Sequence, residues 1–186
     1  MQDVITRANL AAAEIAKAAA AVDPAAFERL VKSIVAARRI ALTGAGREGL
    51  MMRGLAMRLF HLGLDAHVVG EMTCPPLGEG DLLFASAGPG ALATITALVQ
   101  TAREAGADTI CLTAQPGGHT SRAAGSVFHL PAQTMATDRG PTASTLPMGS
   151  VFEGAMFILF ELIILALSDR LGISAEAMRA RHTNLE

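Results

Sequence analysis

The amino-acid sequence predicts an α/β protein whose parallel sheet is covered by helices on both faces. Short apolar segments alternate with longer segments of helical periodicity along most of the chain. The short segments are apolar without polar alternation, which is typical of strands buried on both faces. The chain has 186 residues, the length of one domain, and contains no repeat or linker that would divide it. We therefore expect residues 1–186 to form a single domain.

Two helices are expected before the first strand. Residues 3–21 are rich in helix formers and place their apolar side chains on one stripe. Asp23 can cap a second helix over residues 24–37, because Pro24 suits a first helical turn. Since both helices precede the sheet, we expect them to pack outside it or against a partner.

The rest of the chain alternates between the two kinds of segment. Strands are expected over residues 40–43, 66–69, 81–86, 108–113 and 126–130. Helices are expected over residues 47–62, 91–105, 120–124, 148–171 and 174–181. The apolar run 154–167 is only 14 residues long and contains Glu161, whereas a membrane span needs about 20 apolar residues. We expect a helix buried in the core or at a subunit interface, and no membrane contact.

Composition excludes several classes of function. The net charge is −2 and the chain has no Trp or Tyr, so neither a basic footprint nor a base-stacking surface for nucleic acid is expected. Residues 1–22 carry charges throughout and do not resemble a secretory signal. Two cysteines cannot form a disulfide scaffold, so we expect a cytoplasmic protein. No His, Cys and carboxylate cluster has metal-ligand spacing, and no metal is expected.

Two glycine-rich loops follow predicted strands. The first, at residues 43–49, contains Gly44, Gly46, Arg47 and Glu48 and leads into a helix, where backbone amides can approach an anion. It allows a phosphate or sugar site, a plain turn, or a dinucleotide site. The dinucleotide site is disfavoured because no acidic residue ends the next strand.

The second loop lies at residues 86–91 and includes Ser86, Gly88, Gly90 and Ala91. Parallel strands that end in loops at the same sheet edge form a crevice where open α/β sheets bind ligands. A tight turn without a ligand explains the same residues equally well.

Three further residues have the chemistry of acid–base catalysis. Glu153 precedes the apolar run and is either a carboxylate that favours the helix dipole or a desolvated general base. His61 lies at the end of a predicted helix, where a cation is favoured, and His182 lies near the chain end.

Several stretches together resemble a sugar isomerase (SIS) domain, specifically the 6-phospho-3-hexuloisomerase family. They are residues 43–47, 56–63, 69–71, 80–83, 147–153 and 181–186, of which the last two are the most specific. The resemblance implies a three-layer α/β/α sandwich with a five-stranded parallel sheet of flavodoxin-like type and two extra N-terminal helices. It also implies a homotetramer that isomerises a 3-ketohexose 6-phosphate to fructose 6-phosphate without a cofactor.

The resemblance also implies roles for individual residues. Moving a carbonyl by one carbon through a cis-enediol needs a base at carbon, a proton shuttle between two oxygens and a cation for the enediolate. By resemblance Glu153 is the base, His61 or His182 the shuttle, and Arg47 the cation. The substrate-binding residues implied by the two loops are Gly44, Gly46, Arg47, Glu48, Ser86, Gly88, Gly90 and Ala91.

Both loops depart from the family pattern. The family usually has Ser where this chain has Glu48, and its second loop usually reads Ser-Gly-Ser-Gly-Glu-Thr, with hydroxyls that hold the phosphate. Here only the first hydroxyl, that of Ser86, is kept. The departures predict a different sugar phosphate, or a sugar derivative whose anion is absent or bound elsewhere.

Three functions therefore stay open. The first is an SIS-type isomerase, and the second is a sugar-phosphate-binding domain without catalysis. The third, a dinucleotide-dependent oxidoreductase, lacks the expected ribose carboxylate. In each case the ligand is a small molecule, and the two N-terminal helices and the apolar run offer more apolar surface than one small sheet can cover. We therefore expect a homo-oligomer, specifically a tetramer.

Overall fold

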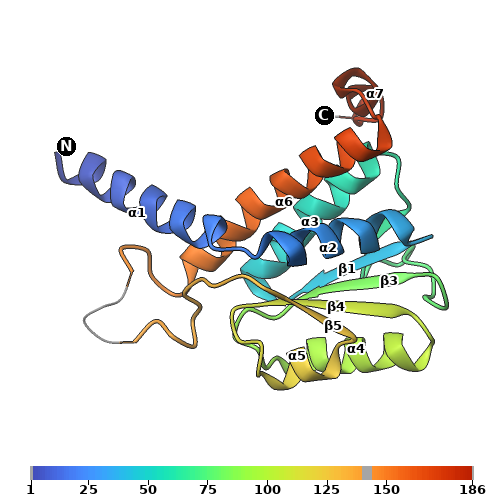
Figure 1. The fold of residues 1–186 in the computed structure, drawn as a ribbon, viewed down its shortest axis with the longest axis horizontal. Coiled ribbons are helices and arrows are strands. Elements are labelled where there is room, and N and C mark those ends of the chain that lie inside the picture. The colour runs from blue at the N-terminus through green and yellow to red at the C-terminus, as the bar shows by residue number, and fades with distance from the viewer. Residues whose placement is uncertain (1, 140–143, 186) are drawn as a thin grey trace.

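A five-stranded parallel sheet forms the centre of the protein and confirms the predicted fold class (Figure 1). The computed structural model describes residues 2–139 and 144–185. The strand order is β2-β1-β3-β4-β5, the flavodoxin-like order. The strands are β1 (Ile40–Gly44), β2 (Ala66–Val68), β3 (Leu82–Ser86), β4 (Asp108–Thr113) and β5 (Ser126–His129). The helices are α1 (Gln2–Ala20), α2 (Pro24–Ala36), α3 (Gly46–His61), α4 (Ala93–Glu104), α5 (His119–Ala123), α6 (Ser150–Leu171) and α7 (Ala175–Ala180).

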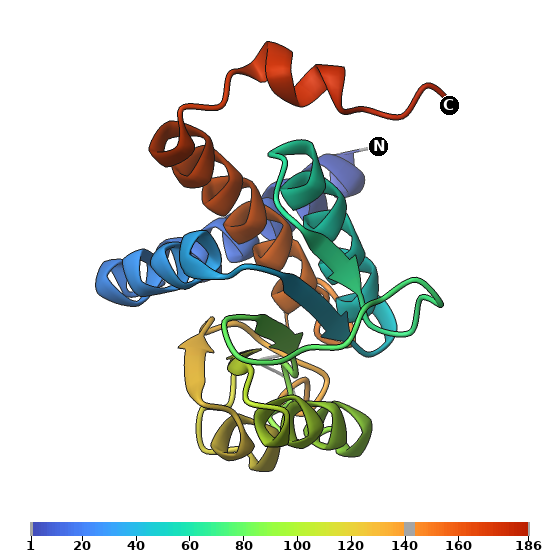
Figure 2. The ribbon, with the colours of Figure 1, turned by 90° about the vertical axis from the view of Figure 1, so that its right-hand side faces the viewer.

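The sheet separates two hydrophobic cores, one on each face. Alternate side chains of β3 divide between them: Leu82 and Phe84 face the core under α2, α3 and α6, while Leu83 and Ala85 face the core under α4. Figure 2 shows α4 and α5 on one side of the sheet and the other long helices on the opposite side. This two-sided burial explains why the strands are apolar along their whole length.

The two N-terminal helices lie outside the sheet, as predicted. Asp23 caps α2 by accepting hydrogen bonds from the amides of Ala25 and Ala26. Helix α1 runs out from the body of the protein (Figure 1), and only its C-terminal half packs against α6, where Ile15 lies over Gly154. Its first turns expose the large apolar side chains Val4, Ile5 and Leu10.

Helix α6 is the apolar helix that the sequence places in the core. By length and composition alone it could cross a membrane, but half of its apolar window is buried against the rest of the protein. One side packs on α1, α2 and α3, while Phe157, Leu162 and Leu165 remain exposed on the other. Gly149 and Gly172 flank the helix in the left-handed conformation, with φ of 79° and 65°.

Replacing Gly149 or Gly172 with alanine should lower the free energy of unfolding by different amounts. Gly172→Ala forces a left-handed alanine into open space, so it should lower the free energy of unfolding by about 1 kcal/mol. Gly149→Ala should cost at least about 2 kcal/mol, because its Cβ would also lie 2.5 Å from the backbone nitrogen of Met135. Urea unfolding of both variants tests this, and equal losses would show that the contact at Gly149 is relaxed without cost.

Candidate active site

A cavity of about 420 Å³ opens at the carboxyl edge of the sheet, where α3 and α6 begin. The sheet register places the end of β1 beside the end of β3, with Gly44 opposite Ser86. The cavity is lined by Ala45, Gly46, Arg47, Glu48, Pro89, Leu92, Thr134, Met135, Met148, Gly149, Phe152 and Glu153. This is the crevice that the two glycine loops predict.

Arg47 ties the first turn of α3 to the start of α6. Its Nε donates to Glu153 Oε1 at 3.2 Å and its Nη1 donates to Ser150 Oγ at 3.1 Å. Its Nη2 donates to the backbone carbonyl of Met148, a residue with a positive φ of 55°. Loops 43–49 and 147–153, which are distant in sequence, are therefore held together by one guanidinium group.

Glu153 lines the cavity, and one of its carboxylate oxygens is unsatisfied. Its Oε2 is buried and receives no hydrogen bond from the described residues. Arg47 Nη2 lies 3.2 Å from it, in an ion-pair contact outside hydrogen-bond geometry. A buried carboxylate oxygen without a hydrogen bond, beside a cation, is suited to accept a proton or a ligand hydroxyl.

Glu48 follows Arg47 in the first turn of α3 and is buried, with 8% of its surface exposed. Its Oε2 accepts hydrogen bonds from Ser86 Oγ at 2.6 Å and from the amide of Gly88 at 2.9 Å. Burial raises the pKa of Glu48 above its ordinary value, although these two hydrogen bonds lower it, and the charge of Glu153 raises it further.

Most backbone amides of the second loop donate hydrogen bonds to other groups of the protein. The amide of Ala87 donates to Leu112, that of Gly88 to Glu48, and that of Gly90 back to Ala87. Pro89 has no amide hydrogen to offer. Gly90 packs against the turn at residues 115–118, and Ala91 is exposed outside the cavity.

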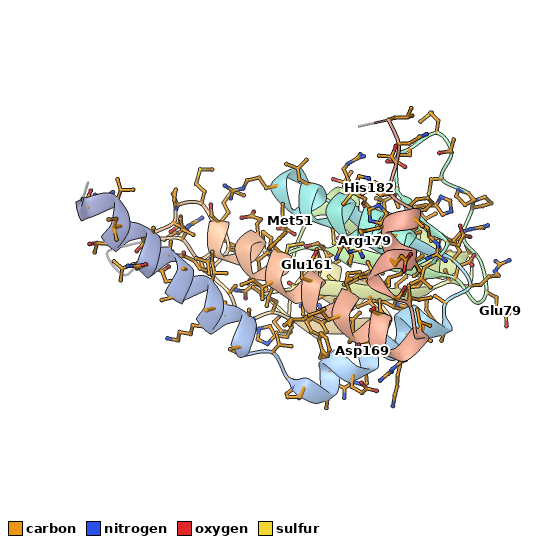
Figure 3. All side chains as sticks on the ribbon, turned by 90° about the horizontal axis from the view of Figure 1, so that it is seen from above. Met51, Glu79, Glu161, Asp169, Arg179 and His182 are labelled. Atoms are coloured by element: carbon orange, nitrogen blue, oxygen red, sulfur yellow. The ribbon has the colours of Figure 1, made fainter. Side chains whose placement is uncertain are left out.

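The two candidate histidines lie together, at the opposite end of α3. The rings of His61 and His182 have centroids 5.2 Å apart, and Figure 3 shows His182 close to Arg179 at that end of the molecule. Arg47 and His61 are 14 residues apart on one helix, a rise of roughly 21 Å. Within one protomer, therefore, neither histidine reaches Glu153.

The structure gives places at or beside the cavity to residues that the sequence did not single out individually. Thr134 comes from the segment after β5, and its Oγ1 is buried without a hydrogen-bond partner among the described residues. Phe152, in the first turn of α6, lines the cavity, and Ser150, in the same turn, accepts a hydrogen bond from Arg47. For Ser150 and Phe152 the signal was their place next to Glu153, whereas Thr134 lies in a loop without a motif.

Metal and thiol chemistry find no support in the described part of the chain. Among residues 2–139 and 144–185, no group of three His, Cys, Asp or Glu side chains could hold a metal ion. Burial raises the pKa of Cys111 to about 11, which keeps its thiol protonated and unreactive. The other cysteine, Cys74, lies away from the cavity.

Comparison with known proteins assigns the fold and the cavity to a family. Residues 33–158 match the SIS domain family. The chain belongs to the SIS domain family. The match begins within α2 and ends within α6, so it contains both ends of the Arg47 contact with Glu153. The described cavity is therefore formed largely by the SIS domain itself.

Relatives of this SIS protein carry a common name. It is 37% identical over 184 residues to a 3-hexulose-6-phosphate isomerase of Mycobacterium gastri, covering 99% of this chain and 92% of that protein. It is 32% identical over 173 residues to one of Bacillus subtilis, covering 93% and 94%. A Methanococcus jannaschii protein of inferred 3-hexulose-6-phosphate isomerase function superposes with a TM-score of 0.82 at 26% identity over both full chains. These relatives support an isomerase.

The raised pKa of Glu48 predicts a pH-dependent effect of Glu48→Gln on the stability of the SIS domain. A carboxyl group whose pKa rises on folding contributes stability that is fully present below its unfolded pKa, near the ordinary value of 4.5. That contribution is lost as pH rises through the folded pKa. The neutral variant should therefore gain stability relative to the parent as the pH rises from 4.5 through neutral pH. Urea unfolding across that range measures the difference.

Glu161→Gln is the control for this experiment. It removes a carboxylate on α6 that pairs with Arg58 outside the cavity, and it should show no gain in stability at high pH. If Glu48→Gln likewise shows no gain in stability at high pH, the carboxylate of Glu48 is exposed to water in solution and its pKa is not raised.

Proposed function

We propose that this protein is a sugar-phosphate isomerase of the SIS family. It moves the carbonyl of a hexulose by one carbon through a cis-enediol, converting 3-hexulose 6-phosphate to fructose 6-phosphate or acting on a related ketose. The observation that carries the proposal is the Glu153 carboxylate, whose Oε2 is buried in the cavity without a hydrogen bond, beside Arg47. The names of its relatives support the same reaction.

The cavity supplies two of the three groups that this reaction needs. Glu153 removes the proton from the carbon beside the carbonyl and returns it to the neighbouring carbon. The guanidinium group of Arg47 lies against the Glu153 carboxylate and is therefore close to the reacting carbon. From there it stabilises the negative oxygen of the enediolate. Both charged groups are held at the start of rigid helices, α3 and α6, so they are positioned before substrate binds.

The third group, the proton shuttle between the two oxygens, is a histidine of a second subunit. An apolar groove of about 200 Å³ lies between α3 and α6, midway between the cavity and the histidines, and Phe157 lines it. A two-fold axis through this groove would place the histidine end of each copy near the partner's cavity. The exposed side chains Leu50, Met57 and Leu165 would be covered by the same contact.

We further propose a homotetramer that works in the cytoplasm and uses no cofactor. The exposed apolar residues of α1 form a surface separate from the groove between α3 and α6. Two separate self-complementary surfaces can generate a tetramer of dihedral symmetry. Sedimentation at micromolar concentration tests this assembly, and a stable monomer would contradict it.

Glu153→Gln should abolish isomerisation while the fold and ligand binding are retained. The amide keeps the shape of the side chain but cannot accept the proton, so kcat should fall by about 10²–10⁴. The measurement is turnover of 3-hexulose 6-phosphate, followed by NMR, together with deuterium exchange at carbon. Asp169→Asn, at an exposed position on the same helix and away from the groove, is the matched control and should retain the parent rate. A rate within a few-fold of the parent would make Glu153 a helix-end carboxylate only.

A mixing experiment tests the shared site. Glu153→Gln and His182→Asn should each be inactive alone, because each removes a group from every site. After subunit exchange, half of the dimers contain one copy of each variant, and one of their two sites is intact. About a quarter of the parent activity should return. A His61→Asn variant mixed in the same way shows which histidine acts, and no recovery in either mixture would exclude a shuttle supplied by the partner.

A further inference from the structure

The backbone of Met148 has an unfavourable conformation at the edge of the cavity. Its φ is 55°, and among the described residues every other positive φ belongs to a glycine. The left-handed region brings a Cβ atom too close to the following carbonyl oxygen. The side chain of Met148 is mostly exposed, so its own packing does not explain the conformation. Contacts made by the backbone must therefore hold Met148 in place.

Two charged side chains bind this backbone. The amide of Met148 donates to Asp138 Oδ2, and its carbonyl accepts a hydrogen bond from Arg47 Nη2. The same guanidinium group donates from Nε to Glu153 Oε1 at 3.2 Å. A continuous series of hydrogen bonds thus runs from Asp138 through Met148 and Arg47 to Glu153, although Asp138 does not line the cavity.

Asp138 is itself fixed by a turn that packs against the start of α6. Its backbone amide donates to the carbonyl of Thr134 at 3.0 Å, and its Oδ1 accepts from Gln133 Nε2 at 2.9 Å. The turn touches α6 closely, since a Cβ atom at Gly149 would lie 2.5 Å from the backbone nitrogen of Met135. The Asp138 carboxylate is therefore held in one position relative to the first turn of α6.

We propose that Asp138 is a positioning residue for the isomerisation, because it holds the Met148 backbone so that Arg47 stays against Glu153. The inference rests on the proposed function and adds a residue from outside the cavity. Without the Asp138 carboxylate, Met148 relaxes to a negative φ and its carbonyl turns away from Arg47. A guanidinium group displaced from the developing charge lowers the rate of the chemical step more than it weakens substrate binding.

The test compares Asp138→Ala with Asp138→Asn in turnover of 3-hexulose 6-phosphate. Alanine removes both acceptors, so kcat should fall by at least about tenfold while KM changes by less than about threefold. Asparagine keeps one oxygen for the amide of Met148, and its new amide group can donate to Gln133 Oε1 once the Gln133 amide turns over. That oxygen is now buried without a partner among the described residues, so the turn loses no hydrogen bond. Asp138→Asn should therefore keep kcat within about threefold of the parent.

Two further variants separate positioning from a general loosening of the loop. In an Arg47→Ala background, Asp138→Ala should cause no further loss of kcat, because Asp138 acts only through Arg47. Glu14→Ala is the matched control, since Glu14 also binds this segment, through Ser144 Oγ and the amide of Thr145, but lies outside the cavity. It should retain the parent kcat.

Four results would overturn the inference: a parent-like kcat in Asp138→Ala, an equal loss in Asp138→Asn, an equal loss in Glu14→Ala, or an undiminished effect of Asp138→Ala in the Arg47→Ala background. A parent that does not turn over the substrate contradicts the proposed function instead. The positioning is then tested by NMR through hydrogen exchange at Arg47 Nε. Exchange should be faster in Asp138→Ala than in the parent and parent-like in Asp138→Asn, and equal rates in all three would overturn it.

Discussion

The packing of α6 along α3 is the constraint on which the site depends. Arg47 joins the two helices at their first turns, and Arg58 joins them again by a bidentate contact with Glu161, with distances of 3.2 and 3.0 Å. Because both helices begin at the carboxyl edge of the sheet, their N-termini meet at one cavity. Each brings its dipole and a carboxylate of its own. The helix packing alone therefore places two negative side chains beside one cation.

This arrangement gives the two carboxylates different environments. Glu153 is held by Arg47 and keeps an oxygen without a hydrogen bond, which leaves it available as a base. Glu48 instead receives two hydrogen bonds from the second loop and is buried, and its pKa is raised by that burial. One carboxylate thus keeps an oxygen without a hydrogen bond, while the other is held by Ser86 and Gly88. Pairs of acids with unlike surroundings commonly divide roles in this way.

The sequence predicted the elements of the fold well because each has a local signal. Apolar strands, helical periodicity and the cap at Asp23 are encoded over a few residues. The position of the cavity could be predicted from the glycine loops. The hydrogen-bond partners of Glu48 could not, because Ser86 comes close to Glu48 only through the pairing of β1 and β3. Thr134 belongs to a loop with no periodic pattern. The sequence did allow the separation of His61 from Glu153 to be predicted, because His61 and Arg47 lie at opposite ends of one helix.

The departures from the family loop pattern are physically coupled. A Cβ atom at Gly88 would lie 2.8 Å from Glu48 Oε1 and 2.9 Å from Phe152 Cε1. With a carboxylate buried at position 48, a serine at position 88 would have no space beside it unless Phe152 moved. The loss of a hydroxyl at 88 and the gain of a carboxylate at 48 are therefore one change in the packing of this loop. A chain that exchanged only Gly88 for serine would have a crowded loop, and one that exchanged only Glu48 would leave Ser86 and the amide of Gly88 without their acceptor.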